Sequence, residues 1–279
     1  MGLDRRQFLL FAALVACVGG ARAAAPLRFG VVPYLTARRL ATLYEPVRGF
    51  FERTLARPVQ FSSAPDYAVH LERLRKREYD LVADSPLFAR LAQREIGYLP
   101  LARTLTPLQA ILVATKDSVL RTPEELRHRA VAVSDPLAAL TMIGLRFLRD
   151  RGLSPGKDIA VHAAGSHVNA IQRVLSGDAE AAIISRTTLQ QIEPALAARI
   201  RIVLDLPQAL SAVVYSAAPV LAAQATDIRR RLIEFSANDA AGKTFIESLG
   251  HRGLVAVGRE LEQMEPLVVE YYRQTSRPD

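Results

Sequence analysis

The chain contains the stretch Asp66-Tyr-Ala-Val-His-Leu-Glu-Arg-Leu-Arg-Lys-Arg-Glu-Tyr-Asp-Leu-Val-Ala-Asp-Ser85 and, further on, Ser166-His-Val-Asn-Ala-Ile-Gln-Arg-Val-Leu-Ser-Gly-Asp-Ala-Glu-Ala-Ala-Ile-Ile-Ser185, and the two align without a gap. Each begins with a residue that favours a helix N-cap, Asp66 or Ser166, and continues with apolar residues at helical spacing. Each then passes through an acidic residue into a short apolar run. This pattern predicts a helix that leads into a buried parallel strand, twice. We therefore expect two similar α/β lobes that face a shared cleft.

The predicted fold class is α/β, a two-lobed binding protein in which each lobe has a mixed, mainly parallel sheet flanked by helices. We assign residues 27–109 and 214–279 to the first lobe and 110–213 to the second, so that the chain crosses between them. Further strand patterns occur at 27–33, 58–62, 110–114, 130–133, 158–162, 200–204 and 212–215. Helices are expected at 40–55, after the capping-box pattern at 122–126, from 136 to about 151, and in the tail from 226.

The first 26 residues are typical of an export signal that is removed. Arg5-Arg6 precedes an apolar run and resembles the twin-arginine signal of bacteria, although an ordinary secretory signal fits as well. Cys17 is the only cysteine; it either becomes the lipidated N-terminus of a lipoprotein or is a small apolar residue, with cleavage near Ala23 instead. Either way, we expect a periplasmic protein, soluble or lipid-anchored.

The composition excludes several classes of function. The net charge is +8, but the arginines are scattered and lack the aromatic interleaving of nucleic-acid binders, so no nucleic-acid partner is expected. The chain contains no phosphate-binding glycine loop, nucleophile elbow or zinc-protease motif. Its five histidines form no obvious metal set. We therefore predict no catalytic residues, no metal and no cofactor.

Parallel α/β sheets bind ligands at the carboxyl ends of their strands, where helix N-termini supply unpaired N–H groups. The candidate ligand-binding residues at such positions are Tyr34, Ser85, Ser134, Thr141, Ser166, His167 and Thr187. Ser85 and Ser166 also fit as helix caps, and His167 as a surface histidine. Arg186 could either clamp an anion or pair with a neighbouring acid.

With these residues identified, the chain resembles the substrate-binding proteins of phosphonate, phosphite and phosphate ABC transporters from Leu27 to about Tyr271. The matching stretches include Ala64-Pro-Asp-Tyr-Ala68, Asp135-Pro136 and Gly165-Ser-His167. The resemblance implies a two-lobed, monomeric periplasmic binding protein. It would capture a small, anionic phosphonate- or phosphate-like ligand by lobe closure and deliver it to an inner-membrane ABC permease, without chemistry on the ligand.

The ligand site departs from the family pattern. Members usually follow Asp-Pro with a Ser-Thr-Ser-Gly run, whereas this chain has Leu137-Ala-Ala-Leu140 and then Thr141. A family tyrosine falls at Leu108, and a carboxylate that holds a ligand amine in some members falls at Thr187. Two alternatives therefore stay open: a binding protein for a less charged small molecule, and a sensory protein read by a membrane receptor or kinase. An enzyme is a third, disfavoured by the missing catalytic motifs.

Overall fold

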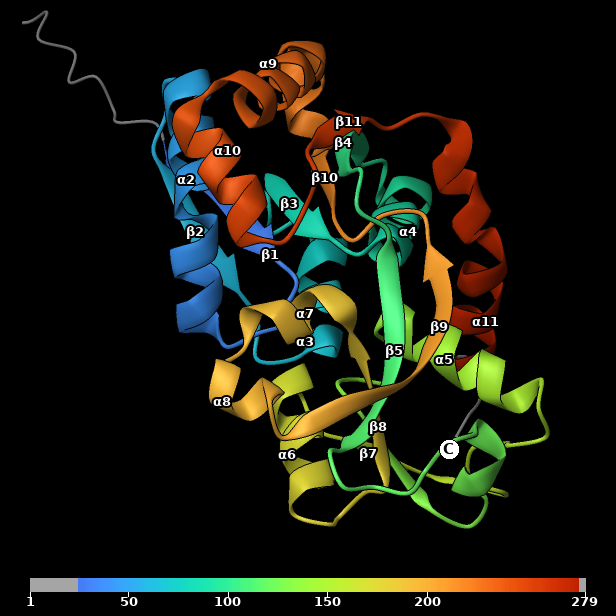
Figure 1. The fold of residues 1–279 in the computed structure, drawn as a ribbon. Helices are drawn as coiled ribbons and strands as arrows, with labels where there is room; N and C mark the ends of the chain where they lie inside the picture. The colour runs from blue at the N-terminus through green and yellow to red at the C-terminus, as the bar shows by residue number, and fades with distance from the viewer. Residues whose placement is uncertain (1–24, 276–279) are drawn as a thin grey trace, which may run out of the picture.

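The computed structural model describes residues 25–275 and contains two β-sheets, each flanked by helices (Figure 1). The first lobe is built on a six-stranded sheet with the order β11-β4-β10-β3-β1-β2. Its strands are β1 (Leu27–Val31), β2 (Val59–Ser63), β3 (Leu81–Asp84), β4 (Leu99–Thr104), β10 (Val214–Ala217) and β11 (Leu254–Ala256). Strands β2, β1 and β3 are parallel, and β10 and β11 run antiparallel to their neighbours.

The second lobe is built on a five-stranded sheet with the order β7-β6-β8-β5-β9. Its strands are β5 (Leu108–Thr115), β6 (Ala130–Val133), β7 (Ala160–Ala163), β8 (Ala181–Ser185) and β9 (Ile200–Ala209). Strands β7, β6 and β8 are parallel, and β5 is antiparallel to β8 and β9. The chain enters this sheet after β4 and leaves it after β9.

Helices cover both sheets. The α-helices are α2 (Ala37–Leu55), α3 (Tyr67–Arg75), α4 (Pro86–Ile96), α5 (Ala139–Arg149), α6 (His167–Leu175), α7 (Arg186–Gln191), α8 (Pro194–Ala197), α9 (Ala225–Asn238), α10 (Ala240–Ser248) and α11 (Glu265–Thr275). Three short 3₁₀ helices complete the structure: η1 (Pro123–Leu126), η2 (Pro219–Gln224) and η3 (Arg259–Met264). Within residues 25–275, none of the helices has the length and apolarity needed to span a membrane.

The repeat seen in the sequence is present in the structure. The order β2-β1-β3 in the first sheet has its counterpart in β7-β6-β8 in the second. Asp66 caps α3 by accepting a hydrogen bond from Val69 N at 2.7 Å, and Ser166 caps α6 by accepting one from Asn169 N at 3.2 Å. The predicted α/β fold with two mixed sheets is therefore confirmed.

Several boundaries differ from the prediction. Helix α5 begins at Ala139, not at 136, because Asp135 first forms a turn in which its side chain accepts a hydrogen bond from Leu137 N. The capping-box pattern after Thr122 gives only the 3₁₀ turn η1, because the Thr122 side chain caps nothing. Strands β4 and β11 were not predicted. The expected signal features at Arg5-Arg6 and Cys17 lie outside the described residues.

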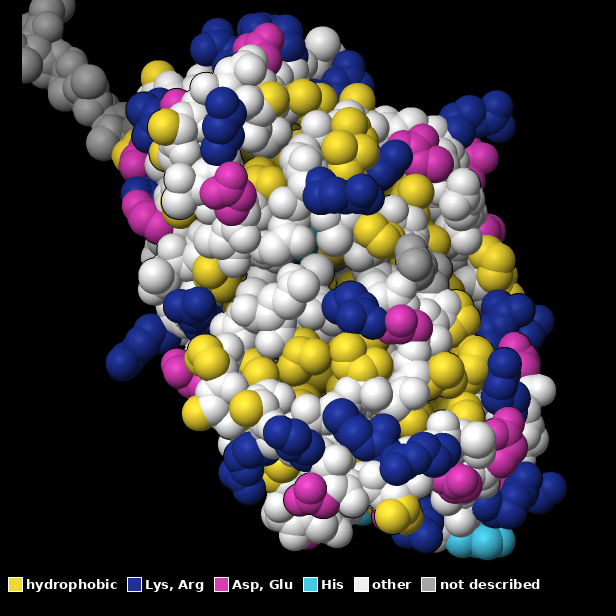
Figure 2. Space-filling model, in the orientation of Figure 1, with side chains coloured by type: hydrophobic (Ala, Val, Ile, Leu, Met, Phe, Trp, Pro, Cys, Tyr) yellow, Lys and Arg dark blue, Asp and Glu magenta, His cyan; other side chains and the backbone are white. Residues whose placement is uncertain are grey.

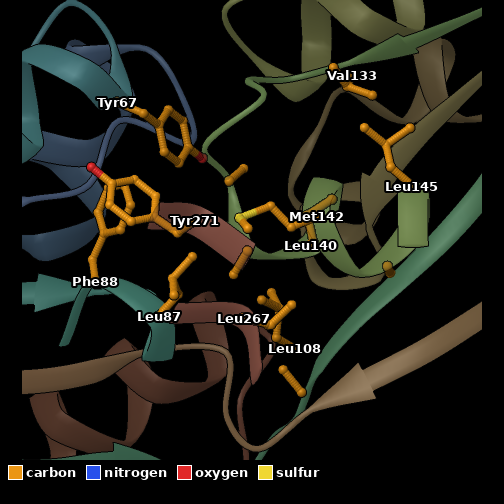
Figure 3. Packing of buried hydrophobic residues seen from close by; sticks show 14 of the residues in the cluster. Tyr67, Leu87, Phe88, Leu108, Val133, Leu140, Met142, Leu145, Leu267 and Tyr271 are labelled. Atoms are coloured by element: carbon orange, nitrogen blue, oxygen red, sulfur yellow. The ribbon is translucent and has the colours of Figure 1, made fainter. Parts of the chain in front are cut away.

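One apolar cluster extends across both lobes. It includes Leu87 and Phe88 from α4 and Leu140 and Met142 from α5 (Figure 3). Helix α11 adds Leu267 and Tyr271 to the same cluster, and it runs beside both sheets along one side of the molecule (Figure 1). The C-terminal helix thus packs on the first lobe and on the second.

A buried hydroxyl pair joins the two segments that cross between the lobes. Thr104 at the end of β4 and Ser211 after β9 are both fully buried, and their hydroxyl oxygens lie 3.0 Å apart. Thr104 Oγ1 also accepts hydrogen bonds from the N–H groups of Ala212 and Val213, each at 3.2 Å. These bonds satisfy polar groups at the crossing that would otherwise be buried without partners.

Candidate ligand-binding site

A cavity lies between the two lobes, at the carboxyl ends of the parallel strands. It encloses about 50 Å³, which is room for a solute of only a few non-hydrogen atoms. Its lining consists of Val32, Tyr34, Tyr67, Ser85, Leu108, Ala138, Ala139, Leu140, His167, Ser185, Thr187, Thr188, Gln191, Ala212, Val213 and His251. This lining combines hydroxyl and imidazole groups with small apolar side chains.

The internal repeat contributes to the cavity twice from each lobe. Tyr67 and His167 occupy the same repeat position, the first residue of α3 and of α6, and both line the cavity. Ser85 and Ser185 are a second equivalent pair. Ser85 directly follows the parallel strand β3, and Ser185 is the last residue of the parallel strand β8. Tyr67 points from α3 toward the segment of the second lobe that leads to α5 (Figure 3). The two similar halves therefore present matching positions to one space.

The N-terminus of α5 opens onto this cavity without a cap. Its N-cap residue is Ala138, which has no side-chain oxygen, and the first helical hydrogen bond runs from Met142 N to Ala138 O. Within residues 25–275, the N–H groups of Ala139, Leu140 and Thr141 have no acceptor. Because the first N–H groups of a helix point outward along its axis, they form a ready site for an anion.

Charged side chains are missing from the cavity lining, which contains no Arg, Lys, Asp or Glu. Burial lowers the pKa of His167 to about 4 and that of His251 to about 4, so both imidazoles are neutral near pH 7. Burial also raises the pKa of Tyr34 to about 12. Positive partial charge at the lining is therefore supplied by helix N-termini rather than by charged side chains.

The surface outside the cavity carries the net charge. On the face drawn in Figure 2, lysine and arginine side chains are scattered among acidic ones and form no continuous stripe. The described residues contain no group of three or more His, Cys, Asp or Glu placed to hold a metal ion.

The structure brings four of the seven predicted site residues together at the cavity: Tyr34, Ser85, His167 and Thr187. The other three, Ser134, Thr141 and Ser166, are not part of the lining. Ser134 and Thr141 are fully buried and their hydroxyls have no partner within the described chain, while Ser166 is occupied as the cap of α6. Arg186 forms an ion pair with Asp205, which agrees with the predicted alternative of pairing with a neighbouring acid.

The predicted set left out five polar residues of the lining: Tyr67, Ser185, Thr188, Gln191 and His251. Tyr67 could have been found, because it is the repeat equivalent of His167. Gln191 ends the short helix α7, and His251 lies in the turn after α10. No local pattern marks either, because only the packing of the two lobes brings α7 against that turn.

A comparison with family models decides the family. Residues 29–260 match the model of the periplasmic substrate-binding proteins of ABC phosphonate transporters. The chain belongs to this family. The resemblance found from its sequence motifs is thereby confirmed, and so is its place among substrate-binding transport proteins of the periplasm. Among curated protein sequences, no match is found.

Solved structures of low sequence identity share the fold of this phosphonate-family protein. The binding-protein component of a Pseudomonas aeruginosa ABC phosphonate transporter is 17% identical, with a TM-score of 0.75 over 89% of this chain and 87% of that one. PhnD1 from Prochlorococcus marinus, solved in complex with methylphosphonate, is 14% identical, with a TM-score of 0.76 over 90% and 98%. The aliphatic sulphonate-binding protein SsuA of Escherichia coli is 18% identical, with a TM-score of 0.65 over 90% and 87%.

Proposed function

We propose that this protein captures a small phosphonate between its two lobes and delivers it to an ABC permease. The observation that carries the proposal is the uncapped N-terminus of α5. Ala139 and Leu140 offer backbone N–H groups at a cavity that contains no charged side chain. An oxyanion placed there would accept these hydrogen bonds and gain from the helix dipole.

The missing hydroxyls at 137–140 do not remove this site. Backbone N–H groups are present whatever the side chain, so Leu137-Ala-Ala-Leu140 loses hydroxyl donors but keeps the helix N-terminus. Ser85, Ser185 and Thr187 line the same cavity and supply hydroxyls from other elements. Anion binding therefore relies more on the main chain than the family pattern does.

The apolar part of the lining suits an organic substituent. Val32 after β1, Leu108 of β5, Leu140 of α5 and Val213 before β10 lie around the cavity. Because the cavity encloses about 50 Å³, the substituent must be hydrogen or a group about as small as methyl. Methylphosphonate and phosphite are thus the first ligands to test, and an aminoalkyl phosphonate would find no carboxylate for its ammonium group.

Closure would involve both lobes as separate bodies. We propose that residues 27–109 with 214–279 and residues 110–213 move about the crossings near Thr104 and Ser211. Tyr67, together with Ser85 on the first lobe, would then meet His167 and Thr187 on the second, with Ser134, Thr141 and Ser166 in supporting positions. A monomer suffices for this mechanism. An export signal at the N-terminus, of twin-arginine or lipoprotein type, would place the protein outside the cytoplasmic membrane.

Isothermal titration with methylphosphonate, phosphite, phosphate and aminoethylphosphonate tests the function. Ala139→Pro removes one N–H donor while keeping a residue that the first helical position tolerates. It should weaken methylphosphonate binding by about tenfold or more, since a hydrogen bond to a charged group contributes about 1.5–3 kcal/mol. Ala240→Pro, at the first position of α10 and away from the cavity, is the matched control. If none of the four compounds binds, the proposed function is wrong.

A further inference from the structure

Gln191 holds its side-chain amide in one orientation. Its Nε2 atom donates a hydrogen bond to the carbonyl oxygen of Leu249 at 2.8 Å, across the boundary between the second and first lobes. Turning the amide over would place two oxygens against each other, so this contact fixes which side Oε1 faces. Gln191 lines the cavity, and its Oε1 atom is buried with no hydrogen-bond partner among residues 25–275.

This side of the cavity differs in chemistry from the N-terminus of α5. An amide oxygen can only accept a hydrogen bond, so Oε1 of Gln191 requires a donor. His251, two residues after Leu249, also lines the cavity and carries a buried Nδ1 atom without a partner in the described chain. The lining therefore combines residues with free N–H groups, Ala139 and Leu140, and one residue, Gln191, whose buried amide oxygen is an acceptor without a partner among residues 25–275.

We propose that the cavity selects an oxyanion that still carries one proton, whose P–OH group donates a hydrogen bond to Oε1 of Gln191. This inference rests on the proposed function and names the ligand form: the monoanion of a phosphonate or of phosphite. A sulfonate of the same shape has the same single charge but no O–H group. It would place an acceptor oxygen against Gln191 and leave the amide oxygen unsatisfied.

The ligand's own ionisation would control binding between about pH 5 and pH 9. Four titratable side chains line the cavity, Tyr34, Tyr67, His167 and His251. Burial lowers the pKa of each histidine to about 4, and it raises the pKa of Tyr34 to about 12 and that of Tyr67 further.

Charged residues occur on α7, just after it, on α10 and in the turn after α10, where Arg252 is exposed and outside the cavity lining. Arg186 of α7 is paired with Asp205, and Glu193 and Glu247 are exposed. None of these is part of the cavity lining. Loss of the second proton of a phosphonate is therefore the titration expected in this range, and affinity should fall as pH rises through it.

Calorimetric titration of the purified protein with methylphosphonate and methanesulfonate tests the inference. At about pH 6 we expect methylphosphonate to bind at least about tenfold more tightly, and this advantage should shrink toward pH 9. Gln191→Leu removes the acceptor and should bring the two affinities together. Gln190→Leu on the same helix, exposed and outside the lining, should keep the wild-type preference.

The possible outcomes distinguish this inference from the proposed function on which it rests. Equal affinities for the two compounds in the wild-type protein, or an affinity for methylphosphonate that rises with pH, would overturn the selection of a protonated oxyanion and leave the proposed function standing. If no oxyanion binds, both this inference and the proposed function are wrong. Because the decisive comparison uses two ligands on the unaltered protein, it does not depend on how well Gln191→Leu folds.

Discussion

His70 and Asp84 form a buried pair, with His70 Nε2 2.7 Å from Asp84 Oδ1 and both side chains fully buried. Asp84 ends β3 immediately before Ser85, the cap of α4. The ring of His70 also stacks on Tyr79, with centroids 5.1 Å apart. The pair thus links α3 to the strand end that positions Ser85.

Removing one partner of this pair should be strongly destabilising. His70→Ala deletes the stacking and leaves the Asp84 carboxylate buried alone, which should lower the free energy of unfolding by about 3–5 kcal/mol. Urea denaturation measures this change. His128→Asn, at an exposed histidine with φ of 62° that asparagine tolerates, should change stability by less than about 0.5 kcal/mol. A loss below about 1 kcal/mol for His70→Ala would show that the pair contributes little.

Adding a side-chain cap to α5 should stabilise the fold and abolish ligand binding. Ala138→Asp places a carboxylate where it can accept from the N–H groups of the first turn, and it should stabilise the fold by about 0.5–2 kcal/mol. The same carboxylate occupies the donors and repels an anion, so methylphosphonate binding should be lost. Thermal unfolding and calorimetry measure the two effects, and Ala138→Gly, which adds no oxygen, should retain binding. Full binding by Ala138→Asp would contradict an anion site at this helix.

Acid should destabilise the protein through its buried histidines. The pKa of His167 and that of His251 are each lowered by burial from 6.5 to about 4, so the unfolded chain binds more protons than the folded one between these values. Stability is thus complete above about pH 6.5 and falls as pH drops toward 4, by up to about 3 kcal/mol per histidine. Urea denaturation across this range should show the fall, and His251→Asn should flatten it. An unchanged slope in the variant would mean that His251 is not the group that titrates.

Helix α11 should contribute to stability through its contact with the second lobe. Glu270 of α11 pairs with Arg149 of α5, and the Glu270 side chain is only 15% exposed. Glu270→Gln should therefore lower the free energy of unfolding by about 1–2 kcal/mol, whereas an exposed pair contributes about 0–1 kcal/mol. Glu262→Gln, which breaks a pair with the 92% exposed Arg259, is the matched control. Equal effects of the two substitutions on urea denaturation would show that the ion pair of α11 contributes no more to stability than an exposed pair.

The repeat made the two-sheet architecture predictable. The caps at Asp66 and Ser166 and the apolar runs ending at Ser85 and Ser185 are local signals, and helices and strands follow them closely. The start of α5 was less predictable, because the turn at Asp135 competes with the helix for the same backbone groups. Strands β4 and β11 are short or irregular in pattern and owe their pairing to distant β10 and to each other.

The cavity was predictable only where a repeat position or a strand end marked it. Ser85 and His167 follow this rule. Gln191 reaches the cavity because Leu249, far away in the sequence, accepts its hydrogen bond, and no pattern in a single segment reports such a contact. The N–H donors at Ala139 and Leu140 were not identified for another reason: they belong to the main chain, and the side chains there are apolar.

A crystal structure of the protein with methylphosphonate would test the proposed binding site most directly. The phosphonate should lie between the two lobes with oxygens within hydrogen-bond distance of Ala139 N and Leu140 N, and its methyl group against the apolar lining. A phosphonate bound elsewhere, or a cavity that stays empty at saturating ligand, would contradict capture at the N-terminus of α5.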